Sequence, residues 1–361
     1  MRQCAQTEWL SDKEYLKKFN QKAAQMRIPL SGSLALTHRC NMRCVHCYLG
    51  PQKNQSAMGK NEMNTNQVLS VINEITEAGC LNLLITGGEP LLRADFVDIY
   101  RHTKKKGLLV TVFSNGTLIS HKILELFDDL PPHVIEITIY GATCATHERI
   151  TGVKGSYEKC VRGIKQLLNH KVNVRLKTIL MTYNQHEFFD MEDMAKNLGV
   201  KFRFDAAIFP CLNGEKAPIS LRVSAKDAVE KEFSNEKRQK DWQNFFEKQK
   251  EAAVPDTRYN CGAGLTNFHI DPYGNLQPCV MTNKYKYSLL NGKFLAHWHN
   301  EIAHFRRQKV SDGYVCNQCK KRLLCGFCPA FFELENGSEE IHSGYLCAMG
   351  QYRFEQLAVA N

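Results

Sequence analysis

Six short apolar segments alternate with segments of helical period over residues 33–206, and this alternation restricts the fold more than any other feature. The strand-like segments are Ser33–Thr37, Leu81–Thr86, Leu108–Ser114, Val134–Ile139, Val172–Leu180 and Val200–Ala206. The helix-like segments between them are Asn66–Ala78, Asp95–Lys106, His121–Phe127, Tyr157–Leu168 and Glu187–Leu198. Strands joined by helical crossovers pair in parallel. Because six units are too few for an eight-stranded barrel, we predict an α/β fold built on a partial, open (β/α)6 barrel.

The segments on either side of the barrel, which we place at residues 32–221, differ in character. Residues 1–31 predict a polar helical extension, and residues 222–258 form a charged amphipathic stretch that predicts a linking helix or helix pair. Residues 259–350 contain short strands, Gly-rich turns and seven cysteines. We expect a small, loop-rich domain there, nucleated by metal rather than by an apolar core, and a tail over residues 351–361.

Composition excludes several classes of protein. The chain has 361 residues, of which 43% are hydrophobic and 23% charged, as in ordinary globular proteins. It has no apolar run of membrane-spanning length and no secretory signal, so we expect a cytoplasmic protein without a membrane span. The net charge of +10 is spread over helix faces and does not indicate nucleic-acid binding. Fifteen cysteines in such a chain indicate metal or cluster ligands rather than disulfides.

Cys40, Cys44 and Cys47 form a C-x3-C-x2-C loop directly after the first predicted strand. The carboxyl ends of strands are where α/β folds place their active sites. Three thiolates in one short loop would hold three irons of a [4Fe–4S] cluster and leave the fourth iron open to chelate a small molecule. The alternative is a structural zinc loop with His46 as the fourth ligand.

The segment Gly87-Gly88-Glu89-Pro90 follows the second predicted strand, one unit after the cysteine loop. Two glycines let a backbone approach a ligand closely, and Glu89 adds an acceptor. Together with the cysteine loop this motif resembles the radical S-adenosylmethionine (SAM) superfamily, where the motif holds the SAM amino group. The resemblance implies that the open iron binds SAM, that reduction cleaves SAM to a 5′-deoxyadenosyl radical, and that little room is left for the zinc alternative.

The same resemblance implies further contacts to SAM. His46 occupies the position of an aromatic residue beside the adenine, and Ser114 with Asn115 matches the position that contacts the ribose. Thr138 matches a hydroxyl residue that contacts the SAM carboxylate.

The family pattern at that last position is Ser-x-Asp-Gly, whereas this chain has Thr138-Ile-Tyr140-Gly141. Tyr140 thus departs from the aspartate, and Thr138 is alternatively a plain strand residue. Arg162 matches an arginine that pairs with the same carboxylate, and an ordinary exposed helix arginine is the alternative.

The seven C-terminal cysteines follow the order C-x12-G-x4-C, then C-x2-C-x5-C-x2-C, then a last cysteine. This order resembles the SPASM extension, which implies two auxiliary iron–sulfur clusters, whereas zinc knuckles are the alternative. By position, the first cluster would take Cys261, Cys279 and Cys328, and the second would take Cys316, Cys319, Cys325 and Cys347. No extra cysteine follows Cys261, so we expect the first cluster to have an open iron, a non-cysteine ligand or the [2Fe–2S] form.

Three classes of function fit these motifs. The first is a maturase that installs a C–C or C–S crosslink, or a related modification, in a ribosomally made peptide. The second is an anaerobic sulfatase-maturating enzyme that generates formylglycine, but those enzymes have an aspartate where this chain has Val280, which cannot take a proton. The third, a non-catalytic iron–sulfur or zinc scaffold, would have no use for a SAM pocket. We expect the first class, with Asp205 after the sixth strand as the candidate base.

The expected partners are a peptide substrate and an external electron donor such as flavodoxin or ferredoxin. About thirty residues precede the first predicted strand, which is too few for a leader-recognition domain. We therefore expect a separate small protein, or the surface itself, to recognise any leader. Among the remaining cysteines, Cys80 and Cys160 are expected in the core, and Cys211 in a loop near the barrel mouth.

Overall fold

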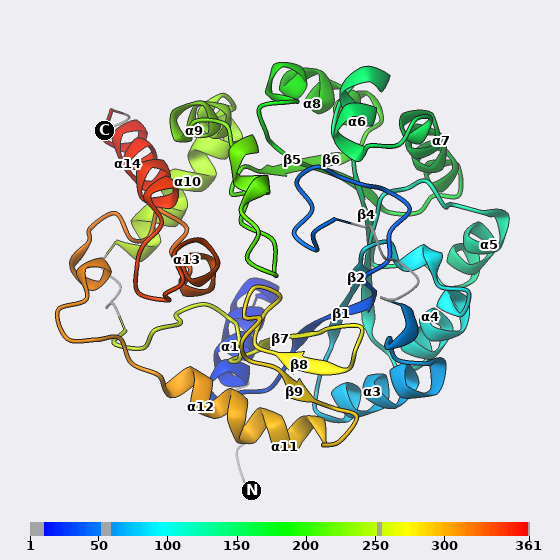
Figure 1. Ribbon diagram of the computed structural model, residues 1–361, viewed down its shortest axis with the longest axis horizontal. Helices are drawn as coiled ribbons and strands as arrows, with labels where there is room; N and C mark the ends of the chain where they lie inside the picture. The colour runs from blue at the N-terminus through cyan, green and yellow to red at the C-terminus, as the bar shows by residue number, and fades with distance from the viewer. Residues whose placement is uncertain (1–10, 52–58, 251–254, 360–361) are drawn as a thin grey trace, which may run out of the picture.

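The computed structural model describes residues 11–51, 59–250 and 255–359. Its centre is a nine-stranded sheet in the order β6-β5-β4-β3-β2-β1-β7-β8-β9, which curves into an open ring with helices on its outer side (Figure 1). Neighbouring strands from β6 to β7 are parallel, and β8 and β9 are antiparallel to their neighbours. The predicted partial barrel is confirmed.

The six barrel strands and their crossover helices lie within a few residues of the predicted segments. The strands are β1 (Ser31–Thr37), β2 (Asn82–Gly87), β3 (Leu109–Ser114), β4 (Val134–Thr138), β5 (Val174–Ile179) and β6 (Lys201–Asp205). The helices that the sequence predicted are α3 (Thr65–Glu77), α4 (Phe96–Lys105), α5 (His121–Asp129), α7 (Ser156–Asn169) and α8 (Phe188–Asn197). Their apolar faces pack on the outer face of the sheet, where Leu34, Val112 and Ile137 are fully buried.

One helix of the barrel is not evident from the sequence. Helix α6 (Cys144–Thr151) follows β4 and is mostly polar, so it lacks the apolar period that identified the others. It is capped instead by local bonds. The Thr143 side chain accepts a hydrogen bond from the Thr146 backbone, and Gly152 ends the helix with a φ of 65°.

The sheet continues into the cysteine-rich region. Strand β7 (Asn267–Ile270) pairs with β1, and it is followed by β8 (Asn275–Gln277), β9 (Tyr287–Ser288), α11 (Phe294–His299) and α12 (Glu301–Arg307). Phe268 and Trp298 are buried in the same core as the barrel strands. The expectation that metal rather than an apolar core would nucleate this whole region is therefore wrong for residues 267–302, because β1 has a free edge that β7 fills.

Helices α9 (Ala225–Phe233), α10 (Glu236–Gln249), α13 (Pro329–Asn336) and α14 (Gly344–Val359) lie on the remaining open side of the ring (Figure 1). The other elements are α1 (Asp12–Gln25) and the single turns η1 (Pro90–Leu92), η2 (Gln185–Glu187), η3 (Ala217–Leu221) and η4 (Val315–Gln318). Helix α1 lies within the stretch predicted as an N-terminal extension, α9 and α10 lie within the predicted linking stretch, and residues 1–10 and 251–254 lie outside the described residues. The tail expected over 351–361 is wrong up to residue 359, because α14 packs there through an ion pair of Arg353 with Glu232 on α9.

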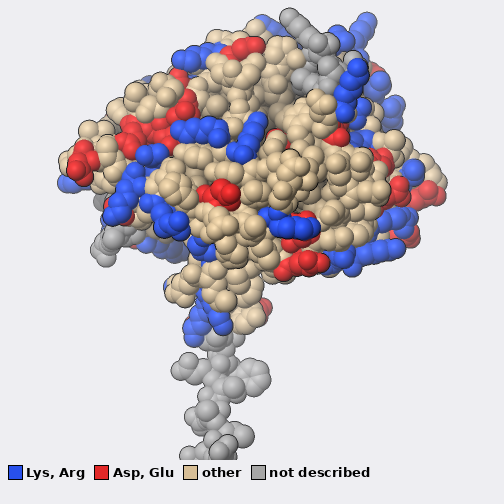
Figure 2. Space-filling view, turned by 60° about the horizontal axis from the view of Figure 1, so that its bottom comes forward, with Lys and Arg blue, Asp and Glu red and all other residues tan. Residues whose placement is uncertain are grey.

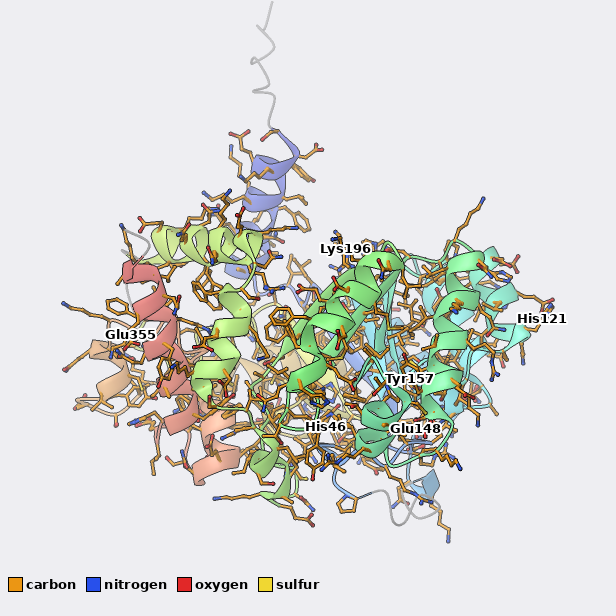
Figure 3. All side chains as sticks on the ribbon, turned by 90° about the horizontal axis from the view of Figure 1, so that it is seen from above. His46, His121, Glu148, Tyr157, Lys196 and Glu355 are labelled. Carbon is orange, nitrogen blue, oxygen red and sulfur yellow. The ribbon has the colours of Figure 1, made fainter. Side chains whose placement is uncertain are left out.

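Two features bear on where the protein works: the length of its helices and the charge of the face shown in Figure 2. Within the described residues, every helix falls short of the length and apolar character needed to cross a bilayer. Lysine and arginine are mixed with aspartate and glutamate over the face shown in Figure 2. Helix α1 projects away from the ring (Figure 3).

Candidate functional site

The three cysteines of the first motif lie in the loop that follows β1, inside the ring of strands (dark blue in Figure 1). Both sides of this loop are fastened by backbone hydrogen bonds. Near β2, the Glu89 amide donates to the Arg39 carbonyl at 2.9 Å. Near α6, the Arg43 amide donates to Thr151 at 2.8 Å and the Val45 amide donates to Ile150 at 3.0 Å. Helix α6 therefore positions the cysteine loop.

The two glycines of the second motif make room for this loop. Gly87 has a φ of 134°, and a Cβ atom there would stand 2.2 Å from the carbonyl oxygen of Thr37. A Cβ atom on Gly88 would stand 2.3 Å from the carbonyl oxygen of Arg39. The two glycines therefore permit a close approach of two backbone segments, as the sequence indicated. The segment that approaches them is the start of the cysteine loop and not a ligand.

The chemistry of the three thiols suits a positively charged group. Burial raises the pKa of Cys40 to about 12 and also raises the pKa values of Cys44 and Cys47. The neighbouring Cys47 adds to the rise at Cys40 and Cys44, which places the thiols close together. In the described part of the chain, no three His, Cys, Asp or Glu side chains form a group that would hold a metal ion. The fit to a cluster rests instead on the chemistry of three neighbouring, partly buried thiols, which iron would deprotonate and stabilise.

Glu89 is fully buried beside the cysteine loop. Its carboxylate accepts hydrogen bonds from the Asn115 amide at 2.7 Å, the Ser114 hydroxyl at 3.0 Å and the Leu91 amide at 3.1 Å. Burial nevertheless raises the pKa of Glu89 to about 7. The structure thus brings together Glu89, Ser114 and Asn115, three of the residues that the sequence assigned to SAM, while the adjacent Pro90 begins the turn η1 and is buried.

A cavity of about 470 Å³ opens at the cysteine loop, which is within the size range of small-molecule sites. It is lined by Cys40, Asn41, Arg43, Leu92, Gly152, Val153 and Lys154. Asn41 also accepts a hydrogen bond from the Asn115 side chain at 2.8 Å, which links the cavity to the Glu89 network. The two cations of the lining, Arg43 and Lys154, were not identified from the sequence, because they belong to no motif.

His46 is neutral and lies against an aromatic ring. Desolvation lowers the pKa of His46 to about 4, and its Nδ1 atom is buried without a hydrogen-bond partner. Its ring meets that of Tyr140 edge to face, with 4.8 Å between the centroids. Figure 3 shows His46 at the same end of the barrel as Glu148 and opposite Lys196.

Charged side chains face the inside of the barrel on β4, β5 and β6. Thr138 at the end of β4 pairs in register with Lys177, which pairs with Arg203. Lys177 Nζ lies 2.9 Å from the ring centroid of Phe113 and 3.9 Å from Glu136. Burial lowers the pKa of Lys177 well below its usual value. The sequence signal for Lys177 is the alternation of charged and apolar residues in Val174–Ile179.

Arg162 and Asp205, which the sequence predicted as site residues, are both solvent-exposed. Arg162 is exposed on α7. Asp205 is exposed at the end of β6, where its carboxylate accepts a hydrogen bond from the Ala207 amide at 2.8 Å. Neither its exposure nor its hydrogen bond from the Ala207 amide singles out Asp205 as a base.

The seven C-terminal cysteines form two groups. Electrostatic repulsion links Cys328 to Cys279 and Cys261, and it links Cys325 and Cys347 to Cys316 and Cys319. Burial raises the pKa values of Cys325 and Cys328 to about 12 each. The two sets have the same members as the ligand sets that the resemblance implied, and they interleave along the chain; their role as cluster ligands stays a prediction.

A second cavity, of about 310 Å³, lies where three segments of the chain meet. Its walls come from the loop Leu212–Gly214, from Met281–Tyr285 after Cys279, and from the start of α13 after Cys328. The Leu212 amide donates to the Tyr48 carbonyl at 2.8 Å, and the Asn283 side chain donates to the Leu212 carbonyl at 2.9 Å. Backbone contacts therefore connect this cavity to the first cysteine loop.

Three of the cysteines outside the motifs lie where the sequence predicted them. Cys80 and Cys160 are buried in the core of the barrel. Cys211 is in the loop after β6, where its Sγ atom donates to the Cys47 carbonyl at 3.4 Å. The Cys211 loop thus lies directly beside the cysteine motif.

Comparison with curated proteins gives a consistent result. The model of the radical SAM superfamily matches residues 34–198. The antilisterial bacteriocin subtilosin biosynthesis protein AlbA of Bacillus subtilis is 30% identical over 312 residues, which cover 83% of this chain and 67% of AlbA. An AdoMet-dependent heme synthase of Nitratidesulfovibrio vulgaris is 25% identical over 331 residues, which cover 82% of this chain and 86% of the synthase.

Solved structures share the fold over nearly the whole chain. Streptococcus suis SuiB bound to the precursor peptide SuiA has a TM-score of 0.69 at 14% identity and covers 96% of this chain and 84% of SuiB. The AdoMet-bound structure of anSMEcpe has a TM-score of 0.71 at 16% identity and covers 92% of this chain and 99% of that protein. With the cysteine loop, the Glu89 network and the match to AlbA, these findings show that this chain belongs to the radical SAM superfamily.

Proposed function

We propose that this protein is a radical SAM maturase that modifies a ribosomally made peptide. The observation that carries the proposal is the second cavity, whose walls include segments that follow Cys279 and Cys328 in the chain. Another part of its wall is the Leu212 loop, whose Leu212 amide bonds to the carbonyl of Tyr48, the residue after Cys47. The relationship to AlbA, a protein of subtilosin biosynthesis, supports a peptide as the substrate.

The lining of this cavity suits a peptide better than an apolar ligand. Lys284 and Glu333, which pair at 3.3 Å, both contribute to it, as does the side chain of Asn283. Glu339 forms part of the wall and is held by Arg258 at 2.6 Å and by the Tyr259 hydroxyl at 2.7 Å. Amide and charged groups of this kind bind peptide backbone and polar side chains.

The cofactors of the family fit residues already described. Cys40, Cys44 and Cys47 would hold the [4Fe–4S] cluster, and Glu89 would accept hydrogen bonds from the SAM amino group. When bound, cluster and SAM supply the 5′-deoxyadenosyl radical that removes a hydrogen atom from the substrate. The chain itself orients SAM through Ser114 and Asn115, and the buried site excludes water.

The auxiliary groups and partners complete the proposal. Two auxiliary iron–sulfur clusters, at Cys261, Cys279 and Cys328 and at Cys316, Cys319, Cys325 and Cys347, would accept the electron left after bond formation. An external donor such as flavodoxin or ferredoxin would supply the reducing electron. We propose that a separate protein, or the surface of this one, recognises any leader segment.

The runner-up is sulfatase maturation. The high TM-score with anSMEcpe concerns the fold alone, because the identity is 16%. Residue identity argues against sulfatase maturation, since Val280 follows Cys279 where that reaction would need a base.

Iron content provides the first test. Anaerobically prepared protein is expected to contain about eleven to twelve irons if all three clusters are cubes or nearly so. Replacing Cys40, Cys44 and Cys47 together by alanine is expected to remove about four of them and all SAM cleavage. Zinc at full occupancy in place of iron would contradict the assignment.

Co-expression with a candidate precursor peptide from the neighbouring genes tests the activity. The peptide is expected to lose two hydrogens, about 2 Da, for each crosslink. Cys279→Ala is expected to abolish this change and leave some uncoupled 5′-deoxyadenosine formation, whereas the exposed Cys144→Ala serves as the control and retains both. Formylglycine in a sulfatase-derived peptide, formed as fast as SAM is cleaved, would establish the runner-up instead.

A further inference from the structure

Four cations lie on the inner face of strands β5 and β6. The apolar residues between them, such as Leu176 and Phe204, pack in the clusters that also contain residues of the outer helices α7 and α8. Because successive residues of a strand point to opposite faces, the charged residues point into the barrel. We call these four residues the inner cationic surface: Arg175, Lys177, Lys201 and Arg203.

The inner cationic surface holds like charges directly opposite each other. The two strands pair in register, so that Arg175 faces Lys201 and Lys177 faces Arg203. Neighbouring strands lie about 4.8 Å apart, and like charges at such a separation repel each other. Two facing pairs of this kind reduce the stability of the free protein. Such departures from the most stable arrangement are expected at functional sites.

The carboxylates of the chain leave this surface with an excess of positive charge. Glu136 on β4 accepts a hydrogen bond from Nε of Arg203 at 3.0 Å and lies 3.9 Å from Nζ of Lys177. Asp205 adds a second carboxylate at the end of β6. Four cations thus face two carboxylates, which gives a net charge of +2 when all six are ionised. In the described part of the chain, Nε of Arg175 is buried without a hydrogen-bond partner.

The surface has both the need and the space for a further anion. Burial lowers the pKa of Lys177 well below its usual value, and the facing Arg203 lowers it further, while Glu136 raises it. A further carboxylate beside the Lys177 ammonium group would stabilise its charged form. The side chain of Arg203 is 52% exposed although it points into the ring, so a ligand can reach it there.

The inner cationic surface lies beside the residues assigned to SAM. Nζ of Lys177 is 2.9 Å from the ring centroid of Phe113. The next residue, Ser114, donates a hydrogen bond to Glu89 at 3.0 Å. A ligand group held on β5 and β6 would therefore be close to the Glu89 network.

We propose that the inner cationic surface binds a carboxylate of the substrate, namely the acidic side chain of a peptide. This inference rests on the proposed peptide-modifying function, and it assigns an acidic residue to the part of the peptide that enters the barrel. The C-terminal carboxylate of a peptide has the same chemistry, so the experiment includes both sources.

Equilibrium dialysis of the anaerobic, iron-loaded full chain measures binding without turnover. The probes are three radiolabelled, N-acetylated peptides: Gly-Gly-Glu-Gly-Gly amide, Gly-Gly-Gln-Gly-Gly amide, and Gly-Gly-Gln-Gly-Gly with a free carboxyl end. The Glu amide is expected to bind about tenfold more tightly than the Gln amide, the effect of one hydrogen bond between charged groups. Equal binding of the two amides would overturn the proposal. Tighter binding of the free-carboxyl peptide than of the Glu amide would overturn the assignment to a side chain.

Arg175→Gln tests the surface itself, because it removes a charge and leaves both partners of Glu136 in place. This variant is expected to bind the Glu amide about tenfold more weakly and the Gln amide as before. Lys159→Gln, on the exposed face of α7, removes the same charge from the outer surface and is the matched control. Equal binding of the Glu amide by Arg175→Gln and the control would contradict the proposal.

Two further measurements separate the alternatives. Lys201→Gln changes an exposed side chain, so it tests the surface even where Arg175→Gln does not fold, and it is expected to weaken binding of the Glu amide about threefold. SAM affinity, measured by anaerobic calorimetry, is expected to be unchanged in both variants. Weaker SAM binding with unchanged peptide binding would assign the surface to the SAM carboxylate and refute the proposal. Because dialysis involves no turnover, a co-expressed peptide that stays unmodified would refute the proposed function and leave these binding results as they are.

Discussion

Glu89 is fully buried, and its carboxylate accepts hydrogen bonds from three groups. A buried carboxylate held in this way is suited to bind a cationic ligand. Ser114 and the amides of Leu91 and Asn115 orient its oxygens. Burial still raises its pKa to about 7, so the existing donors do not fully replace water. A ligand amino group beside it would supply the missing stabilisation.

Replacing Glu89 by glutamine or alanine is expected to weaken SAM binding by about ten- to a hundredfold, the typical effect of a lost hydrogen bond between charged groups. Iron content is expected to remain constant, because Glu89 is not a ligand of the cluster. Anaerobic calorimetry measures the affinity, and Glu158→Gln, on the exposed face of α7, is the control. SAM binding equal to that of the original protein would exclude this pocket.

The pH dependence of stability follows from the same carboxyl group. Its pKa is about 7 in the folded chain and has an ordinary value of 4.5, so the folded state retains a proton that the unfolded state has released. The contribution of Glu89 to the free energy of unfolding is therefore greatest below pH 4.5, falls by about 3 kcal/mol up to pH 7, and is constant above.

Thermal unfolding of SAM-free protein at pH 5 and pH 8 tests this sign. The melting temperature of the original protein, relative to that of Glu89→Gln, is expected to be higher at pH 5 than at pH 8. A difference that is equal at both values, or that increases with pH, would show that Glu89 is ionised throughout.

At the scale of elements, the short helix α6 determines the shape of the cysteine loop. Its last turn accepts the amides of Arg43 and Val45, and Gly152 ends it in the left-handed region. A Cβ atom on Gly152 would stand 3.0 Å from the Arg43 carbonyl oxygen, which leaves little space for any other residue.

Gly152→Ala is expected to cost about 1 kcal/mol of stability for the positive φ, and to lower SAM cleavage as well by displacing the loop at Arg43. Gly155→Ala is the matched control. Gly155 also has a positive φ, of 76°, but a Cβ atom there would meet no other atom within 4 Å. Both variants are expected to lose similar stability in thermal unfolding, and only Gly152→Ala to lose SAM cleavage. Equal cleavage by the two would refute the positioning role of α6.

At the scale of the whole molecule, α14 ties the second cysteine group to the barrel. The guanidinium of Arg353 is mostly buried and pairs with Glu232 on α9 at 2.6 Å. It also donates to the carbonyl of Leu324, next to Cys325, at 2.6 Å. Cys347 lies in the first turns of the same helix. The position of Cys347 relative to Cys325 therefore depends on this ion pair.

Arg353→Met is expected to destabilise the protein by about 3–5 kcal/mol, because it leaves Glu232 as an unpaired, poorly solvated charge. Iron is expected to be lost from the second group first, with SAM binding retained, as measured by iron analysis and calorimetry. Adding Glu232→Leu is expected to recover most of the stability, since it removes the unpaired charge. A double variant as unstable as the single one would contradict this account.

The sequence by itself determined the parts of this protein that depend on local period and covalent spacing. The alternation of strands and helices predicted the barrel, because each crossover buries its own apolar face. The spacing of Cys40, Cys44 and Cys47 and the glycine pair at Gly87 indicated the SAM site in the same way. Residues a few positions apart on one loop or strand end cannot be far apart in space.

Only the tertiary structure decided which distant segments meet. Strand β7 joins β1 because that edge of the sheet is open, and no local period encodes this pairing. The polar helix α6 is stable because it packs on the cysteine loop. Lys177 pairs in register with Thr138 and Arg203 and lies beside Phe113 and Glu136, so its surroundings come from three neighbouring strands as well as its own. Such contacts join residues far apart in the chain, and packing against the whole sheet is what selects them.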